Sequence, residues 1–344
     1  MKPNKTDKQT FRLVLCFIFL TLFLSNATPM PSPAKTEAEK RAIIQEIYLL
    51  YHRKDYTNAL ERVEKGLKAI GSTQELLQLK YHILMDQKKY PDALAFIDHE
   101  IQTSGETEVL LAARYTVLYA MENWKGALDT ALKKEKMTKI KSPWDCLNLV
   151  HVFIQMGRKD EALDWLDEAA RRGFTSYRIL ADPKYALLGG DSRFYEIIEK
   201  IKRFIGLGEP AKDFTTALLS AENFTLSSKR GSVVVIFFWA TWCEPCKAEI
   251  PSLQEYYNQF KDKGLEMVGI NLDSNAQKMN DYIQQTHWLG KHAYSGLVWK
   301  DPIVRLYRID SLPALRLVDK KGILRAVDLK GTELRKAIET LVAE

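Results

Sequence analysis

The sequence predicts two folds in one chain: an all-α helical array, followed by an α/β domain with a central mixed sheet flanked by helices. Two observations lead to this prediction. In the first part, one alanine recurs at intervals of about 34 residues, at Ala59, Ala93, Ala127 and Ala162. In the second part, apolar runs of strand length alternate with amphipathic segments of helix length.

The first 27 residues have the pattern of a signal peptide. A basic stretch precedes the apolar run 13–24, and Ser25-Asn-Ala27 then offers small residues for cleavage. The run is short for a membrane span, which needs about 20 residues, although an uncleaved anchor through 13–24 is an alternative. Residues 28–36 form a proline-rich linker. We therefore expect an exported protein, periplasmic or otherwise extracytoplasmic.

Composition excludes some classes of function. The hydrophobic fraction of 46% and the charged fraction of 27% are ordinary for a globular protein. Half of the formal net charge of +6 lies in the leader, and no arginine-rich face with interleaved aromatic residues follows it. Nucleic-acid binding is therefore not expected. The four cysteines are too few for a disulfide-stapled scaffold, so the chain must fold by burying a core.

Residues 37–205 are expected to form paired helices. The recurring alanine opens the second helix of each pair, where the helices approach too closely for a larger side chain. A 34-residue period is the tetratricopeptide spacing, and this region resembles a divergent array of four such repeats. A generic helical bundle is the alternative, because other positions of the repeat are degenerate. Such arrays bind proteins along a concave face, so the resemblance implies a protein partner here.

Residues 206–344 form the second predicted domain, and Gly206–Pro210 is the expected joint. A small hairpin is expected around Phe214 and Phe224. Further strands are predicted at 233–239, 265–272, 314–318 and 323–328, and helices at 244–262, 276–288, 301–308 and 332–343. Strands alternate with helices at first, and a hairpin and a final helix follow. This order gives a sheet of mixed direction.

The segment Trp239-Ala-Thr-Trp-Cys-Glu-Pro-Cys246 connects an apolar strand to a helical pattern. Cys243 stands at the helix N-terminus, where free N–H groups and the helix dipole favour a thiolate, the attacking species in disulfide exchange. Cys246 is close enough to attack the resulting mixed disulfide. Half of a zinc site and two core thiols are the alternatives, but no second cysteine pair follows. We therefore expect redox chemistry without a metal or another cofactor.

These residues also carry a family resemblance. The stretch from Phe238 to Pro251, together with the hairpin beginning at Pro210 and the segment Val268–Asp273, resembles the exported TlpA/ResA-like thiol–disulfide oxidoreductases of the thioredoxin fold. The resemblance covers residues 207–344. It implies that Cys243 is the exposed nucleophile, that Cys246 is the buried resolving thiol, and that the two form a disulfide.

The resemblance further implies which residues meet the client protein. Pro313 matches the cis-proline that packs against the cysteine pair, and it leaves the backbone of Leu312 free to pair with a client strand. An ordinary trans turn is the alternative for Pro313. The family usually has threonine after this proline, whereas this chain has Ala314. Trp242 is expected to shield the disulfide and to contact the client.

Glu249 is the expected proton-handling group. It lies six residues after Cys243, where the resemblance places a glutamate, and one helical turn beyond Cys246. A carboxylate there can take the proton that the resolving thiol must lose. A solvated glutamate, or an ion pair with Lys247 or Lys261, is the alternative.

The leading functional hypothesis is an exported reductase of client protein disulfides, supplied with electrons by a membrane thiol donor. A disulfide oxidase or isomerase is one alternative, because tens of millivolts decide the direction. A redox-inactive scaffold, in which the helical array does the work, is the other. We expect Cys146 to be a buried core thiol, with a partner-linking thiol as the alternative, and Trp239 to lie in the core. His287 and His292 are expected at the surface or in the core rather than in catalysis.

Overall fold

The computed structural model describes residues 37–288 and 290–344, so the predicted leader and linker lie outside the described residues. The chain divides into two compact units. One holds the described residues up to Lys141 together with Asn148–Arg158, and the other holds Ser142–Leu147 and Lys159–Glu344. This division comes earlier in the chain than the expected joint after residue 205. The reason is that residues 159–205 bond to the α/β part, as at Thr175 and Phe204.

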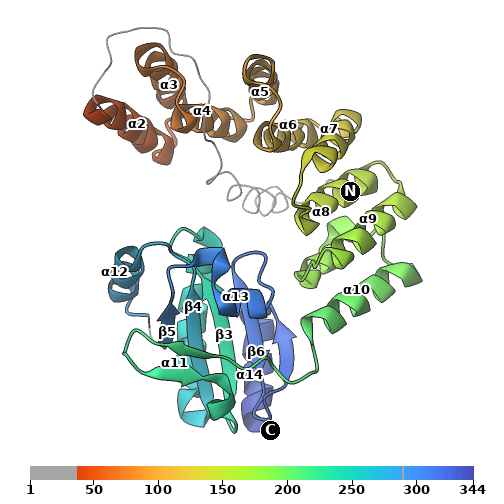
Figure 1. Ribbon diagram of the computed structural model, residues 1–344, viewed down its shortest axis with the longest axis vertical. Coiled ribbons are helices and arrows are strands. Elements are labelled where there is room, and N and C mark those ends of the chain that lie inside the picture. The colour runs from red at the N-terminus through yellow and green to blue at the C-terminus, as the bar shows by residue number, and fades with distance from the viewer. Residues whose placement is uncertain (1–36, 289) are drawn as a thin grey trace. The chain divides into compact units, whose positions relative to one another are not determined.

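The first part of the described chain is entirely helical, as predicted (Figure 1). Its helices are α2 (Glu37–His52), α3 (Tyr56–Ile70), α4 (Gln74–Asp86), α5 (Tyr90–Ser104), α6 (Glu108–Ala120), α7 (Trp124–Met137), α8 (Pro143–Gln155) and α9 (Lys159–Arg171). The short turns η2 (Tyr177–Ala181) and η3 (Pro183–Tyr185) then lead to α10 (Ser192–Ile205). No helix among the described residues has the length and apolar character needed to cross a membrane.

Short polar side chains start these helices. Thr73 and Thr107 accept hydrogen bonds from backbone N–H groups in the first turns of α4 and α6. Asp55 and Asn123 do the same for α3 and α7. Each bond satisfies one of the N–H groups that a helix start leaves without a partner, so the sequence fixes where these helices begin.

The recurring alanines occupy equivalent positions. Each is the fourth residue of the second helix in its pair, and each side chain is 0% exposed, at Ala59, Ala93, Ala127 and Ala162. A methyl group fills the available space at these four points. The repeated placement is what a 34-residue structural unit predicts.

We expect Ala127→Leu to destabilise the protein by about 1–3 kcal/mol, because extra methylene groups would overpack the buried contact of α7. Urea denaturation of the full chain measures the change. The control is Ala42→Leu, at an exposed position of α2, which should change stability by less than about 0.5 kcal/mol. Equal stability of the two variants would contradict a tight helix pair at Ala127.

The second part contains a five-stranded sheet in the order β5-β4-β3-β6-β7. Its strands are β3 (Val233–Trp239), β4 (Leu265–Asn271), β5 (Lys291–Tyr294), β6 (Ala314–Val318) and β7 (Leu324–Val327). β3 pairs in parallel with β4 and antiparallel with β6. β4 and β5 are parallel, and β6 and β7 are antiparallel. The predicted mixed sheet is therefore confirmed, and β5 is an addition to the predicted strands.

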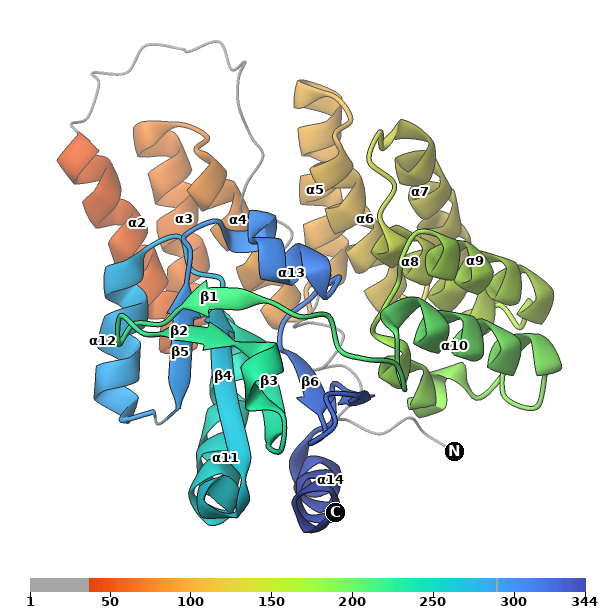
Figure 2. The same cartoon turned by 60° about the horizontal axis from the view of Figure 1, so that its bottom comes forward.

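The remaining elements flank this sheet. The helices are α11 (Glu244–Phe260), α12 (Ala276–Thr286), α13 (Pro302–Leu306) and α14 (Gly331–Ala343). Figure 2 shows α11 and α14 side by side. The predicted hairpin is β1 (Thr215–Ala217) with β2 (Asn223–Thr225), which pair antiparallel. Short 3₁₀ turns are η4 (Leu226–Lys229), η5 (Lys261–Lys263) and η6 (Val298–Lys300).

Strand β3 lies at the centre of this part. All seven of its residues are buried, and neighbours pair with it on both sides. Apolar residues from the helices complete the same core, among them Ile250, Leu253 and Ile338. The chain leaves the end of β3 and enters α11 after a loop of four residues, so this loop is held between two buried elements.

Candidate active site

The cysteine pair lies at the start of α11. Cys243 is the N-cap residue of this helix, and Pro245 lies in its first turn. A disulfide joins Cys243 and Cys246, with a Cα–Cα distance of 5.2 Å. The backbone N–H of Cys246 points at the sulfur of Cys243, at an N···S distance of 3.2 Å. A negative charge on Cys243 would therefore face a free helix terminus, which stabilises anions.

Both sulfur-bearing residues are buried in this disulfide state. Cys243 is 2% exposed and Cys246 is 0% exposed, and both belong to the apolar core of the domain. Cys243 thus differs from the exposed nucleophile that we expected. In this state its sulfur is bonded to Cys246, and the residue belongs to the core.

Asp273 holds the loop in front of the cysteines. Its carboxylate accepts a hydrogen bond from the backbone N–H of Thr241 at 2.9 Å and another from the hydroxyl of Thr241 at 2.7 Å. Asn271 donates a third bond to the same carboxylate at 2.7 Å. Asp273 is buried, so these bonds offset the cost of removing its carboxylate from water. Sequence reasoning noted the Val268–Asp273 segment but assigned no role to Asp273.

Aromatic residues lie around the pair. Trp239 is fully buried, as expected for a core residue. Trp242, directly before Cys243, is half-buried against the core and lies 6.5 Å from Trp299, measured between ring centroids. Trp299 and its neighbour Leu297 are both exposed. The surface beside the disulfide is therefore partly apolar.

Pro313 and Glu249 line the same small hollow, of about 10 Å³, together with Asp328 and Lys330. The peptide bond between Leu312 and Pro313 is cis, and Leu312 lies just outside strand β6. The structure thus brings together residues from α11, from the loop before β6 and from the segment after β7.

Glu249 has an ion partner that the sequence did not predict. Its carboxylate lies 3.8 Å from the ammonium group of Lys330, and the Glu249 side chain is 26% exposed. Lys247, one of the two expected partners, instead pairs with Glu244. Lys330 follows β7 and is far from Glu249 in sequence, so no local spacing reveals the contact.

Cys146 is the remaining described cysteine. It forms no disulfide with another described cysteine and is fully buried, as expected for a core thiol, and its thiol donates to the backbone oxygen of Ser142 at 3.9 Å. Among the described residues, no group of three or more His, Cys, Asp or Glu side chains could hold a metal ion.

His292 is buried on strand β5, against the rings of Trp239 and Trp288. Burial lowers the pKa of its imidazole to about 4. As the pH falls, the imidazole of His292 therefore becomes protonated near pH 6.5 in the unfolded chain but only near pH 4 in the folded chain. Between these values the unfolded state holds more protons, so folding stability decreases as the pH falls.

We expect His292→Gln to remove this contribution. Wild-type protein should lose on the order of 3 kcal/mol of stability between pH 7 and pH 4 through His292, and the variant should lack that part of the loss. Urea denaturation at pH 7, 5 and 4 measures it. The control is His287→Asn, because His287 is exposed and its left-handed backbone suits asparagine. Parallel pH curves for wild type and H292Q would contradict the burial effect.

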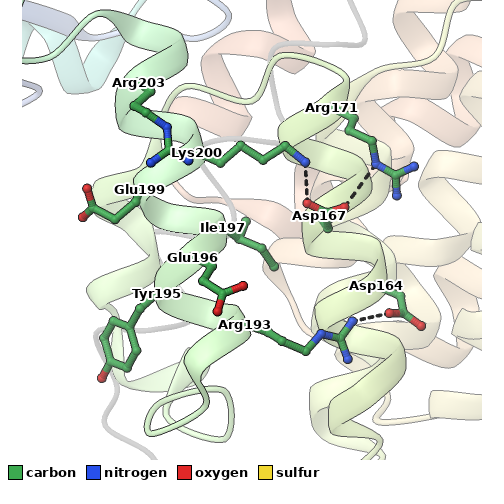
Figure 3. A pocket seen from close by; sticks show the side chains of 10 residues that line it. All are labelled: Asp164, Asp167, Arg171, Arg193, Tyr195, Glu196, Ile197, Glu199, Lys200 and Arg203. Atoms are coloured by element: carbon green, nitrogen blue, oxygen red, sulfur yellow. Dashed lines mark hydrogen bonds and ion pairs between the residues drawn. The ribbon is translucent and has the colours of Figure 1, made fainter.

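A larger hollow, of about 810 Å³, lies between α9 and α10 (Figure 3). Its charged side chains largely neutralise one another: Lys200 contacts Asp167 at 2.7 Å, and Arg193 pairs with Asp164. Arg171 also reaches Asp167, at 3.2 Å. Such exposed pairs contribute little energy each. This hollow is a solvated charged surface, and it holds none of the predicted site residues.

Comparison with known proteins assigns this domain. Residues 207–327 match the AhpC/TSA family. Over 145 residues the chain is 30% identical to the thioredoxin-like protein YneN of Bacillus subtilis. This match covers 42% of this chain and 84% of YneN. The chain belongs to the thioredoxin-like thiol–disulfide oxidoreductases.

The chain is also similar to two further proteins. The chain is 28% identical over 138 residues to the thiol–disulfide oxidoreductase ResA of Geobacillus kaustophilus, covering 40% of this chain and 77% of ResA. A crystal structure of the thioredoxin domain of a thiol–disulfide oxidoreductase from Bacteroides vulgatus is 29% identical. It covers 40% of this chain and 97% of that domain, with a TM-score of 0.37. Because thiol–disulfide oxidoreductases are among its sequence relatives, the thioredoxin-like domain is an enzyme domain, and it follows a helical array in this chain.

Proposed function

We propose that this oxidoreductase acts as an exported reductase of disulfides in client proteins. In the reduced enzyme, the Cys243 thiolate attacks one sulfur of the client disulfide. A mixed disulfide forms, and one client thiolate leaves and takes up a proton. The Cys246 thiolate then attacks the Cys243 sulfur, and the second client thiolate leaves. Two electrons and two protons pass to the client, and the enzyme keeps the Cys243–Cys246 disulfide.

Burial of both sulfur atoms supports the reductive direction. A thiolate in an apolar core lacks hydration, whereas a disulfide carries no charge and loses little there. A reduced form that is not stabilised by ionisation gives up its electrons more readily. The N-terminus of α11 stabilises a thiolate on Cys243 and so favours the reduced form of the enzyme, but it faces only one of the two sulfurs.

The deciding experiment is the reduction potential of the pair. We expect equilibration in glutathione buffers to give a value below about −200 mV, together with catalysed reduction of insulin by dithiothreitol. A potential above about −150 mV would make the enzyme an oxidant instead. Wild-type protein without any insulin reduction would favour the scaffold alternative.

The proposal includes an extracytoplasmic location and two kinds of protein partner. The leader pattern of residues 1–27 supports an extracytoplasmic location, where client disulfides form and where a membrane thiol donor must return the enzyme to its dithiol state. The recurring buried alanines support a tetratricopeptide-like platform for a protein partner on the helical array.

We also propose that Glu249 takes the proton of the resolving thiol. Its place one turn after Cys246 on α11 supports this role, and Lys330 provides a counter-charge for its carboxylate. Glu249→Gln should then change the pH dependence of thiol reactivity and leave the fold intact. The measurement is the rate of Cys243 alkylation against pH in the reduced proteins. The control is Glu255→Gln, further along the same helix. Superimposable curves for wild type and E249Q would leave Glu249 as an ion-pair partner only.

A further inference from the structure

The loop that precedes Pro313 is bonded to the end of the helical array. We use the term proline loop for residues 308–313 and closing segment for residues 174–178, and both belong to the second compact unit. The backbone N–H of Thr175 donates to the Asp310 carboxylate at 3.4 Å. The Thr175 hydroxyl donates to the backbone oxygen of Arg308 at 3.3 Å.

Ser176 adds a second set of contacts. Its hydroxyl donates to the other carboxylate oxygen of Asp310 at 3.4 Å. It also lies 3.2 Å from the hydroxyl of Ser311, which itself donates to Asp310 at 3.2 Å. Two consecutive residues of the closing segment thus engage three residues of the proline loop.

The closing segment is itself firmly held. Thr175 and Phe174 are buried, and the ring of Phe174 packs edge-to-face on Trp144 at 5.5 Å. The following helix, α10, contacts the proline loop separately through Phe204. The guanidinium of Arg308 lies 3.7 Å from the centre of the Phe204 ring and donates to the Phe204 backbone oxygen. Packed aromatic rings therefore fix the partners of the proline loop.

Asp310 depends on these contacts. Burial raises the pKa of its carboxyl group, the bonds from Thr175 and Ser311 oppose that rise, and the charge of Asp328 adds to it. Removing the donors of the closing segment would leave a half-buried carboxylate with fewer partners. The loop would then find other arrangements, and Leu312 and Pro313 follow Asp310 directly in the chain.

We propose that the closing segment is a positioning element for client binding: Thr175 and Ser176 hold Asp310, and thereby set the backbone of Leu312 against the client strand beside the cysteine pair. The helical array therefore contributes to the active site of the oxidoreductase as well as offering a surface for partners. This inference rests on the proposed action on client proteins. The contact between the closing segment and the proline loop can be tested without an activity assay.

The first test is proximity. Ser176→Cys and Ser311→Cys are introduced together into full-length protein with Cys243→Ser and Cys246→Ser, and the thiols are oxidised with copper phenanthroline. We expect peptide mapping to find the 176–311 disulfide in most of the protein. The matched pair Ser228→Cys with Ser311→Cys should form none. Absence of the 176–311 bond would overturn the inference, whatever the enzyme does to insulin.

The second test separates binding from chemistry. Thr175→Val with Ser176→Ala removes two hydroxyl groups at nearly constant volume. We expect KM for insulin to rise about fivefold, with kcat for insulin and the rate with a small aromatic disulfide changing less than twofold. Asp310→Leu should act similarly, and Asp310→Asn, which keeps an acceptor oxygen, should retain a KM near wild type. Ser228→Ala, an exposed hydroxyl on η4, is the control.

The outcomes are distinct. A raised KM with rescue by D310N supports the positioning role. An unchanged KM in all variants, or an equal loss with both substrates together with a lower melting temperature, overturns it. Failure of the proposed function would show differently, as no insulin reduction by the wild-type protein.

Discussion

Cys243→Ser will reduce insulin turnover to background, a loss of at least about a thousandfold, because it removes the thiol at the N-terminus of α11, and both Cys246 and Cys146 are fully buried. Cys246→Ser will instead accumulate mixed disulfides between Cys243 and client, since the resolving thiol is missing. Turnover assays and non-reducing gels measure both effects. The control is Cys146→Ala, which removes the third described cysteine and should keep wild-type turnover.

Two results would contradict these roles. Wild-type turnover in both single variants would show that the pair is not catalytic. Trapping in Cys243→Ser rather than in Cys246→Ser would exchange the two roles. The trapping experiment decides between the two assignments, because the two residues differ by only two percentage points in exposure in the disulfide state.

Asp328→Ala will destabilise the protein by about 3–5 kcal/mol, because it leaves a buried positive charge without its partner. Arg316 is 1% exposed, and its guanidinium lies 3.0 Å from the Asp328 carboxylate. The same carboxylate accepts the backbone N–H of Leu315 at 2.8 Å. Urea denaturation at pH 7 measures the loss.

Two variants calibrate this result. Asp328→Asn should cost less, because its amide oxygen still accepts from Leu315 and asparagine tolerates the left-handed backbone of this position, with φ of 52°. Glu61→Ala breaks the exposed pair with Lys65 and should leave stability nearly unchanged, because solvent screens that pair. A loss in D328A no larger than in E61A would show that Arg316 finds another partner.

Features set by neighbouring residues could be predicted from the sequence. The cysteine pair, the strand before it and the helix after it are continuous in the chain, so their order alone fixes their geometry. Helix α12 ended two residues earlier than predicted because His287 adopts a left-handed backbone that stops the helix. Strand β5 was not predicted, since its four residues hold a lysine and a histidine and follow a glycine.

Contacts between distant segments could not be predicted in this way. Asp273, Lys330 and Asp310 reach the site from the ends of β4 and β7 and from the loop before β6. Each is an ordinary charged residue in a turn, and its structural role depends on which segment of the chain packs against it. A single sequence shows the spacing within one element but does not show these pairings.

The central place of β3 has a consequence for how the protein opens. Its amides are paired on both sides and all its side chains are buried, so their exchange with solvent requires nearly complete unfolding of the thioredoxin-like unit. On their outer sides the edge strands β5 and β7 have no full strand beside them and are bonded only at isolated positions, β5 by Leu219 and β7 by Gly208 and Glu209, so they open with fewer bonds broken than β3. The cysteines are therefore attached to the slowest-exchanging element of the sheet. A protease or a chaperone that recognises local opening would meet the edges first and would leave the disulfide in place.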